Sequence, residues 1–210
     1  MKKLLLCVNA LKKGSEGKLV CARMDEFSGL GKKESKELFN ELCFCLLTAN
    51  FNAERAIKIQ EALGDGFFSL SEKKLAKKLK QLGYRYPNTR AKYISEARKH
   101  AASLKDTIKS FSSEAEARHW LAENVKGLGY KEASHFLRNI GFKNLAIIDF
   151  HIADILAEHG LIEKPKSKAL SRKQYLEIEK VLEKVAAKAG MNLAELDLYL
   201  WCAETGKILK

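Results

Sequence analysis

Two side chains with complementary chemistry, a lysine and an aspartate, stand near each other in the sequence. Lys131 follows the glycine-rich segment K-G-L-G-Y at 126–130, and Asp149 follows the apolar run L-A-I-I at 145–148. A neutral amine can attack a sugar carbon and form a Schiff base, while a carboxylate stabilises the positive charge that develops there. Because a free lysine amine has a pKa near ~10.4, a site that uses one as a nucleophile must favour its neutral form through desolvation or nearby positive charge.

The glycine-rich segment predicts a tight turn between two helices. Gly127 and Gly129 allow the backbone to turn sharply and to expose N–H groups at the start of the next helix, and such a helix N-terminus attracts phosphate. Apolar residues recur at helical spacing on both sides of the turn: Ala117, Trp120, Leu121, Val125, Ala133, Phe136, Leu137 and Ile140. With Gly141 as the stop of the second helix, the pattern predicts a helix-hairpin-helix over residues 117–141.

Asp149 stands directly before the apolar-periodic segment 151–156, where an acidic residue is predicted to cap the N-terminus of a helix. Considered separately, Lys131 would be a solvated side chain and Asp149 only a helix cap. Considered together, with a glycine hairpin before the first and an apolar run before the second, they favour a catalytic pair.

The two segments also carry a family resemblance. The sequences L-G-Y-K-E-A-S at 128–134 and I-I-D-F-H-I-A-D at 147–154 resemble the helix-hairpin-helix/Gly-Pro-Asp superfamily of DNA glycosylases, although an isoleucine replaces the proline. This resemblance implies that Lys131 is the nucleophile and that Asp149 is the aspartate that closes the loop. Members with a lysine at this position both release a base and cleave the strand.

A second candidate DNA contact follows the apolar helix expected at 34–49. In the superfamily that the chain resembles, the amide after this helix enters the gap left by a flipped base, which implies this role for Asn50. An amide can satisfy the donors and acceptors of the unpaired partner base. The alternative is that Asn50 only ends a helix, with Asn52 or a neighbour capping the next one at 53–63.

The segment L-G-Y-R-Y-P-N-T-R-A-K-Y-I at 82–94 combines aromatic and basic residues in a loop that leads into a helix. Aromatic rings such as Tyr84 and Tyr86 stack on bases, and Arg85 and Arg90 are predicted to reach phosphates. Packing inside the protein is the alternative for the tyrosines.

The last residues, L-W-C-A-E-T-G-K-I-L-K at 200–210, extend the resemblance over nearly the full chain to the type 2 8-oxoguanine DNA glycosylase/AP lyases. The resemblance implies that Trp201 and the terminal carboxylate of Lys210 line the pocket for the oxidised base. N7 of 8-oxoguanine is a hydrogen-bond donor, and a carboxylate can accept from it. N7 of guanine is an acceptor, so it and the carboxylate would be two acceptors facing each other, a mismatch that costs ~1–3 kcal/mol. The alternatives are core packing for Trp201 and a frayed terminus for Lys210.

The spacing of apolar residues predicts an all-α protein. Only two prolines occur in 210 residues, 46% of the residues are hydrophobic, and no sustained alternation predicts strands. We expect two helical domains that flank a DNA-binding cleft. One domain is formed by residues 1–32 and 146–210, and the other, residues 33–145, carries the helix-hairpin-helix. The last two helices are expected at 173–189 and 193–203.

Composition favours an intracellular protein with a nucleic-acid partner. The 38 Lys and Arg against 26 Asp and Glu give a net charge of +12, which favours a polyanion, although the lysines at 73–80 can equally form a solvated helix face. No apolar stretch is long enough to span a membrane. Five scattered cysteines, with only Cys202 near the C-terminus, indicate a reducing compartment and no iron–sulfur cluster. Neither metal nor organic cofactor is expected, and we expect a cytoplasmic, nucleoid-associated monomer.

Together these features predict a bifunctional DNA repair enzyme that acts on double-stranded DNA containing oxidised guanine. It would excise 8-oxoguanine through a Schiff base on Lys131 and nick the strand 3′ to the abasic site by β-elimination. Two alternatives remain open. The first is a glycosylase for another oxidised base, and the second is a non-catalytic helix-hairpin-helix module in which Lys131 only contacts phosphate.

Overall fold

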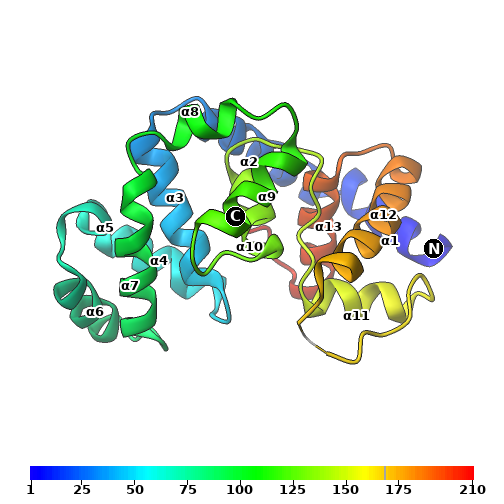
Figure 1. The fold of residues 1–210 in the computed structure, drawn as a ribbon. Coiled ribbons are helices and arrows are strands. Elements are labelled where there is room, and N and C mark those ends of the chain that lie inside the picture. Colours follow the sequence, from blue (N-terminus) through cyan, green and yellow to red (C-terminus); the bar gives the residue numbers. More distant parts are fainter. Residues whose placement is uncertain (168) are drawn as a thin grey trace. The chain divides into compact units, whose positions relative to one another are not determined.

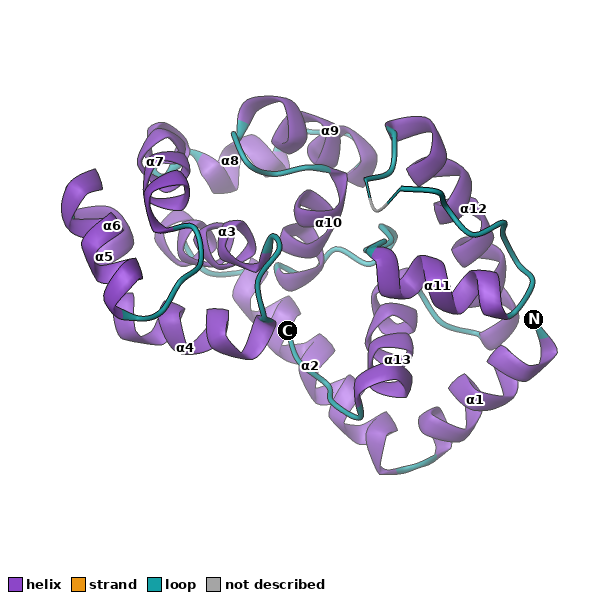
Figure 2. Cartoon of the chain, turned by 90° about the horizontal axis from the view of Figure 1, so that it is seen from below, coloured by secondary structure: helices purple, strands orange, loops and turns teal. Residues whose placement is uncertain are grey.

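Helices make up all the regular elements in the part of the chain that the structure describes. The computed structural model describes residues 1–167 and 169–210, and within these residues Figure 2 shows helices and loops alone. The prediction of an all-α fold is therefore confirmed. Pro87 occupies the first position of a helix, where its missing N–H has no intrahelical partner in any case.

The chain divides into two compact units. The terminal unit comprises residues 1–29 and 141–210, and the central unit comprises residues 30–140. The helices of the terminal unit are α1 (Lys2–Lys13), α2 (Ser15–Gly31, whose last residues belong to the central unit), α11 (Phe150–Glu158), α12 (Arg172–Ala189) and α13 (Leu193–Thr205).

The central unit contains the remaining helices. They are α3 (Ser35–Thr48), α4 (Ala53–Leu63), α5 (Gly66–Ser69), α6 (Glu72–Gln81), α7 (Pro87–Ala97), the 3-10 helix η1 (Arg98–His100), α8 (Leu104–Lys109), α9 (Glu114–Asn124) and α10 (Tyr130–Asn139). The helices that the sequence predicts at 34–49, 53–63, 173–189 and 193–203 are confirmed as α3, α4, α12 and α13, and their ends differ by two residues at most.

In the terminal unit, the first helix packs against the last two. α1 contacts α12 and α13, so the blue and the orange-red ends of the chain lie side by side (Figure 1). Val8 of α1 and Leu182 and Leu200 of the two C-terminal helices are buried there. The ammonium group of Lys12 also donates to the carbonyls of Ala189 and Gly190, at 3.3 and 3.0 Å, and thereby satisfies the C-terminal end of α12.

In the central unit, α3 forms the core. Its residues from Glu41 to Thr48 are all buried, and α4, α7, α8 and α10 pack around it. The Glu41 carboxylate accepts hydrogen bonds from Asn139 of α10 at 2.6 Å and from Gln60 of α4 at 3.2 Å. This buried network fixes α10 and α4 against α3, because a buried polar group that lost its partner would cost about 1–3 kcal/mol.

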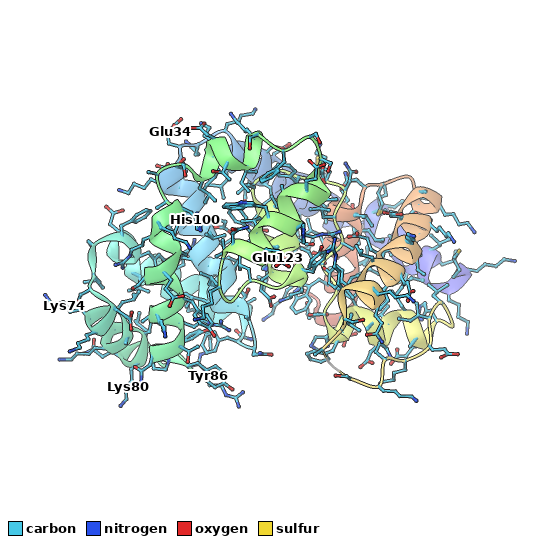
Figure 3. All side chains as sticks on the ribbon, in the orientation of Figure 1. Glu34, Lys74, Lys80, Tyr86, His100 and Glu123 are labelled. Carbon is cyan, nitrogen blue, oxygen red and sulfur yellow. The ribbon has the colours of Figure 1, made fainter. Side chains whose placement is uncertain are left out.

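The basic helix α6 presents one apolar face to the unit and its lysines to solvent. Leu75 and Leu79 are buried, whereas Figure 3 shows that the side chains of Lys74 and Lys80 point outward. In the part of the chain that the structure describes, no helix has the length and apolar character that crossing a membrane requires.

Candidate active site

The glycine-rich segment forms the turn of a helix-hairpin-helix, as the sequence predicts. α9 and α10 flank the hairpin 125–129, and Gly129 caps the start of α10. The Gly129 N–H donates to the Glu132 carboxylate at 3.3 Å, which satisfies one of the donors that the helix start leaves unpaired. The hairpin therefore joins two helices of the central unit and places backbone N–H groups at the start of α10.

Gly127 is the one position of the hairpin that requires a glycine. Its φ is +92°, and a Cβ there would overlap the ring of Tyr93, which lies on α7. Next to it, the Lys126 ammonium group lies 5.7 Å from the centre of the same ring and 3.7 Å from the Glu96 carboxylate. These contacts pack the tip of the hairpin against α7.

We expect Gly127→Ala to reduce the free energy of unfolding by about 2–4 kcal/mol, because it adds backbone strain and a steric overlap. The matched control is Gly160→Ala, at a φ of +64° with no atom within 4 Å of the added carbon. This control should lose only the backbone part, about 1–2 kcal/mol. Urea denaturation measures both values, and equal losses would show that the Tyr93 contact does not constrain the hairpin.

Lys131 lies in the first turn of α10, directly after the hairpin. Its side chain is 25% exposed, and its Nζ lies 3.8 Å from Oε1 of Glu132. The buried guanidinium group of Arg118 lies 4.9 Å from the centre of the neighbouring Tyr130 ring and donates to Ser134 at 3.4 Å. These contacts hold the first turn of α10, and they place a partly exposed amine beside a helix N-terminus, which attracts phosphate.

Asp149 caps the N-terminus of α11, as predicted. Its Oδ1 accepts the backbone N–H of Ile152 at 3.0 Å. The apolar run before it is fastened to α12 by the Tyr175 hydroxyl, which accepts from the N–H of Ile148 at 3.2 Å and donates to the carbonyl of Ala146 at 2.7 Å. Two helices of the terminal unit, α11 and α12, therefore set the position of this carboxylate.

Two aromatic residues that directly follow Asp149 were not identified from the sequence as site residues. The rings of Phe150 and His151 lie 3.9 Å apart, and His151 meets the Trp201 ring edge-on at 5.9 Å. Phe150 is 42% exposed, an unusual position for so large an apolar ring. Trp201 and Lys210, the predicted pocket residues, are both half-buried. An aromatic group with polar neighbours thus lies next to Asp149 in the chain, a composition that suits stacking on a base.

The predicted DNA contacts of the central unit separate into exposed and buried residues. Asn50 is exposed and has a φ of +56°, and it is the only residue other than glycine with a positive φ among residues 1–167 and 169–210. Arg85 and Tyr86 are also exposed, with the guanidinium group 5.0 Å from the ring centre (Figure 3 labels Tyr86). These three residues have the accessibility that a DNA contact requires.

Arg90 differs from the expectation of an arginine that reaches phosphates. It is 8% exposed, and its guanidinium group donates to the carbonyl of Ala49 at 3.0 Å and to the hydroxyl of Tyr84 at 3.1 Å. Tyr84 is buried as well, which agrees with the packing alternative for this residue. Both side chains are buried because they donate hydrogen bonds to carbonyls at the end of α3. Sequence patterns around position 90 do not reveal these acceptors.

Within the described residues, His, Cys, Asp and Glu side chains form no group of three that could hold a metal ion. Cys43 and Cys45 are buried in α3.

Comparisons with known proteins identify the family of the chain. The family model described as 8-oxoguanine DNA glycosylase matches residues 20–191. A Korarchaeum cryptofilum protein named 8-oxoguanine DNA glycosylase/AP lyase is 56% identical over 97% of this chain and 96% of its own length. A Methanocaldococcus jannaschii 8-oxoguanine glycosylase/lyase, solved with a 15mer DNA containing 8-oxoguanine, is 46% identical with a TM-score of 0.96, and the match covers 99% of this chain and 100% of that one. The 8-oxoguanine DNA glycosylase of Thermotoga maritima is 43% identical with a TM-score of 0.93, over 100% of this chain and 99% of that one. The chain therefore belongs to the 8-oxoguanine DNA glycosylase family.

Proposed function

We propose that this protein excises 8-oxoguanine from double-stranded DNA and then cleaves the strand 3′ to the abasic site. The observation that carries the proposal is the position of Lys131, in the first turn of α10 directly after the hairpin, in a chain that belongs to this family. Asp149 supports the same conclusion, because it is a carboxylate whose position two helices define.

The proposed reaction begins when the hairpin N–H groups bind a phosphate and the damaged nucleotide leaves the base stack. The neutral amine of Lys131 attacks C1′ of the sugar, the bond from C1′ to the base breaks, and the base departs with the bonding electrons. Asp149 stabilises the positive charge that develops on the sugar while this bond breaks.

The Schiff base then permits strand cleavage. Opening of the sugar ring gives an imine between Lys131 and C1′. The imine acidifies the protons on C2′, and loss of one of them expels the 3′ phosphate by cleavage of the C3′–O bond. Hydrolysis of the imine releases the sugar remnant and restores the free amine. Only Lys131 forms a covalent bond to DNA in this scheme.

The other candidate residues have proposed roles in DNA recognition. Asn50 would fill the gap left by the extruded base, and Arg85 would contact phosphate. Trp201 would stack on 8-oxoguanine, while the terminal carboxylate of Lys210 would accept a hydrogen bond from its N7.

Borohydride trapping tests the proposed function. The wild-type protein is incubated with a duplex containing 8-oxoguanine, with the undamaged duplex and with a duplex containing an oxidised pyrimidine. A covalent adduct with the 8-oxoguanine duplex alone is the expected result. An adduct with the pyrimidine lesion instead would identify a related glycosylase, and binding without any adduct would identify a non-catalytic DNA-binding module.

Removing Lys210 should impair lesion selection more than general DNA affinity. The terminal carboxylate would shift by about 3.3 Å to the preceding residue and would no longer meet N7 of the base. We expect discrimination between 8-oxoguanine and guanine to fall roughly 10- to 100-fold. The control Lys207→Gln removes a nearby charge and keeps the chain length. Equal losses of binding to damaged and undamaged duplex would contradict the pocket role.

We further infer that the protein acts as a monomer, in the compartment that contains the DNA. The formal net charge of +12 supports an association with DNA. Light scattering of the free protein and of its complex with a short duplex would report the mass of each, and a dimer in both would contradict the monomer.

A further inference from the structure

Two turns of the central unit carry the exposed candidates for DNA contact. The first, residues 49–52, joins α3 to α4, and the second, residues 82–86, joins α6 to α7. α3 packs against both α4 and α7, and α7 packs against α6, so that both turns lie at the lower end of the unit in Figure 1. Side chains that lie between the two turns hold the first turn, residues 49–52, in place.

Arg90 and Tyr84 satisfy the end of α3. The Tyr84 hydroxyl donates to the carbonyl of Leu47 at 2.9 Å, and Arg90 donates both to this hydroxyl and to the carbonyl of Ala49. Burial raises the pKa of the Tyr84 phenol, which keeps the proton that this bond requires. The last carbonyls of a helix have no intrahelical partner, and a cation there is also favoured by the helix dipole. The backbone is therefore fixed up to the residue before Asn50.

The start of α4 is fixed to the second turn in a similar way. The Arg55 guanidinium group donates to the carbonyl of Gly83 at 2.9 Å and lies 5.1 Å from the centre of the Phe51 ring. The Phe51 ring in turn lies 4.5 Å from the ring of Tyr84. Asn50 is thus the exposed apex of a turn that is held on the α3 side by Tyr84 and Arg90 and on the α4 side through the carbonyl of Gly83.

The backbone of Asn50 requires such support. A positive φ is uncommon for a residue with a side chain, although asparagine tolerates it better than most, and it persists where the surrounding structure enforces it. On the α3 side, Tyr84 and Arg90 hold the carbonyls of Leu47 and Ala49, and the Phe51 N–H donates across the turn to the carbonyl of Thr48 at 3.2 Å.

We propose that Arg90, together with Tyr84, is a positioning residue that holds the end of α3 so that Asn50 presents its amide in one conformation. The proposal rests on the proposed function for the role of Asn50 in base extrusion. Arg90 would then act on the reaction through Asn50, without touching DNA.

Hydrogen exchange of the free protein tests the positioning directly. Arg90→Met removes both hydrogen bonds, and Tyr84→Phe removes the hydroxyl but leaves the contact between Arg90 and the Tyr93 ring intact. We expect both variants to accelerate exchange over residues 49–56 about tenfold. The matched control is Arg98→Met, since Arg98 also donates to two backbone carbonyls, of Phe67 and Leu70, both at 2.7 Å. It should accelerate exchange at residues 66–70 instead.

Kinetics test the connection to Asn50. In single-turnover assays with 8-oxoguanine duplex, Arg90→Met should slow base excision roughly 10- to 100-fold. Strand cleavage at a preformed abasic site, which has no base to extrude, should stay within about twofold of the wild type. In an Asn50→Ala background, adding Arg90→Met should change excision less than about twofold, because the positioned residue is already absent.

Unchanged exchange at 49–56 in both variants, or fully additive effects of Arg90→Met and Asn50→Ala, would overturn the inference. If Arg90→Met does not fold, Tyr84→Phe carries the same comparisons. A wild-type protein without excision activity would overturn the proposed function, while the exchange measurement would still decide whether Arg90 and Tyr84 hold Asn50.

Discussion

Lys131→Gln is expected to abolish both the borohydride-trapped adduct and strand cleavage. Glutamine keeps a polar side chain of similar length but has no amine that could attack C1′ and form an imine. Removal of the nucleophile in an enzyme with covalent catalysis should slow excision by about three orders of magnitude or more. Trapping with an 8-oxoguanine duplex, followed by separation of protein–DNA adducts by mass, measures this result.

The matched control is Lys126→Gln, which removes a second lysine amine from the same helix-hairpin-helix. Lys126 lies in the hairpin near Glu96 and is outside the first turn of α10. We expect weaker DNA binding from this control but a normal yield of adduct once the DNA is saturated. An adduct that persists in Lys131→Gln and vanishes in Lys126→Gln would show that Lys126, and not Lys131, is the nucleophile.

Asp149→Asn should leave DNA binding near normal and slow excision about 10²- to 10³-fold, the usual effect of losing one preorganised electrostatic group. The substitution isolates the charge, because asparagine caps a helix about as well as aspartate and can still accept the Ile152 N–H. Single-turnover excision from a saturating 8-oxoguanine duplex measures the effect. Unchanged rates would refute the electrostatic role of this carboxylate.

Asp149→Ala separates the structural role of the same residue from its chemical role. Loss of the cap should lower the free energy of unfolding by about 1 kcal/mol, whereas Asp149→Asn should change it little. If both variants excise equally slowly although only one is destabilised, the missing charge accounts for the lost activity. A rate that follows stability instead would make Asp149 only a cap.

Much of the helical structure could be predicted from the sequence, because the signals are local. The hairpin follows from Gly127 and Gly129 between two apolar periodic segments, and the cap on α11 follows from Asp149 before residues 151–156. Turns, caps and helix periodicity depend on residues within a few positions of one another, and such contacts form in any context that tolerates the helix.

The surroundings of individual side chains were harder to predict from the sequence than the helices. Arg90 stands in a segment rich in aromatic and basic residues and was therefore expected at phosphates, yet it is buried against the end of α3. Phe150, in contrast, directly precedes the apolar-periodic segment 151–156 that predicts a helix, and in the structure it is the exposed first residue of α11. In both cases the sequence pattern predicts the helix correctly but does not predict the surroundings of the side chain.

The sequence by itself determined the helices at 34–49, 53–63, 173–189 and 193–203 to within two residues at each end, and it indicated which amine and carboxylate could perform the chemistry. Only the tertiary structure decided that Arg90 and Tyr84 hold the turn of Asn50, and that Tyr175 of α12 fastens the run before Asp149. The physical reason is that these hydrogen bonds join residues 27 to 41 positions apart in the sequence, so they exist only after the helices have packed.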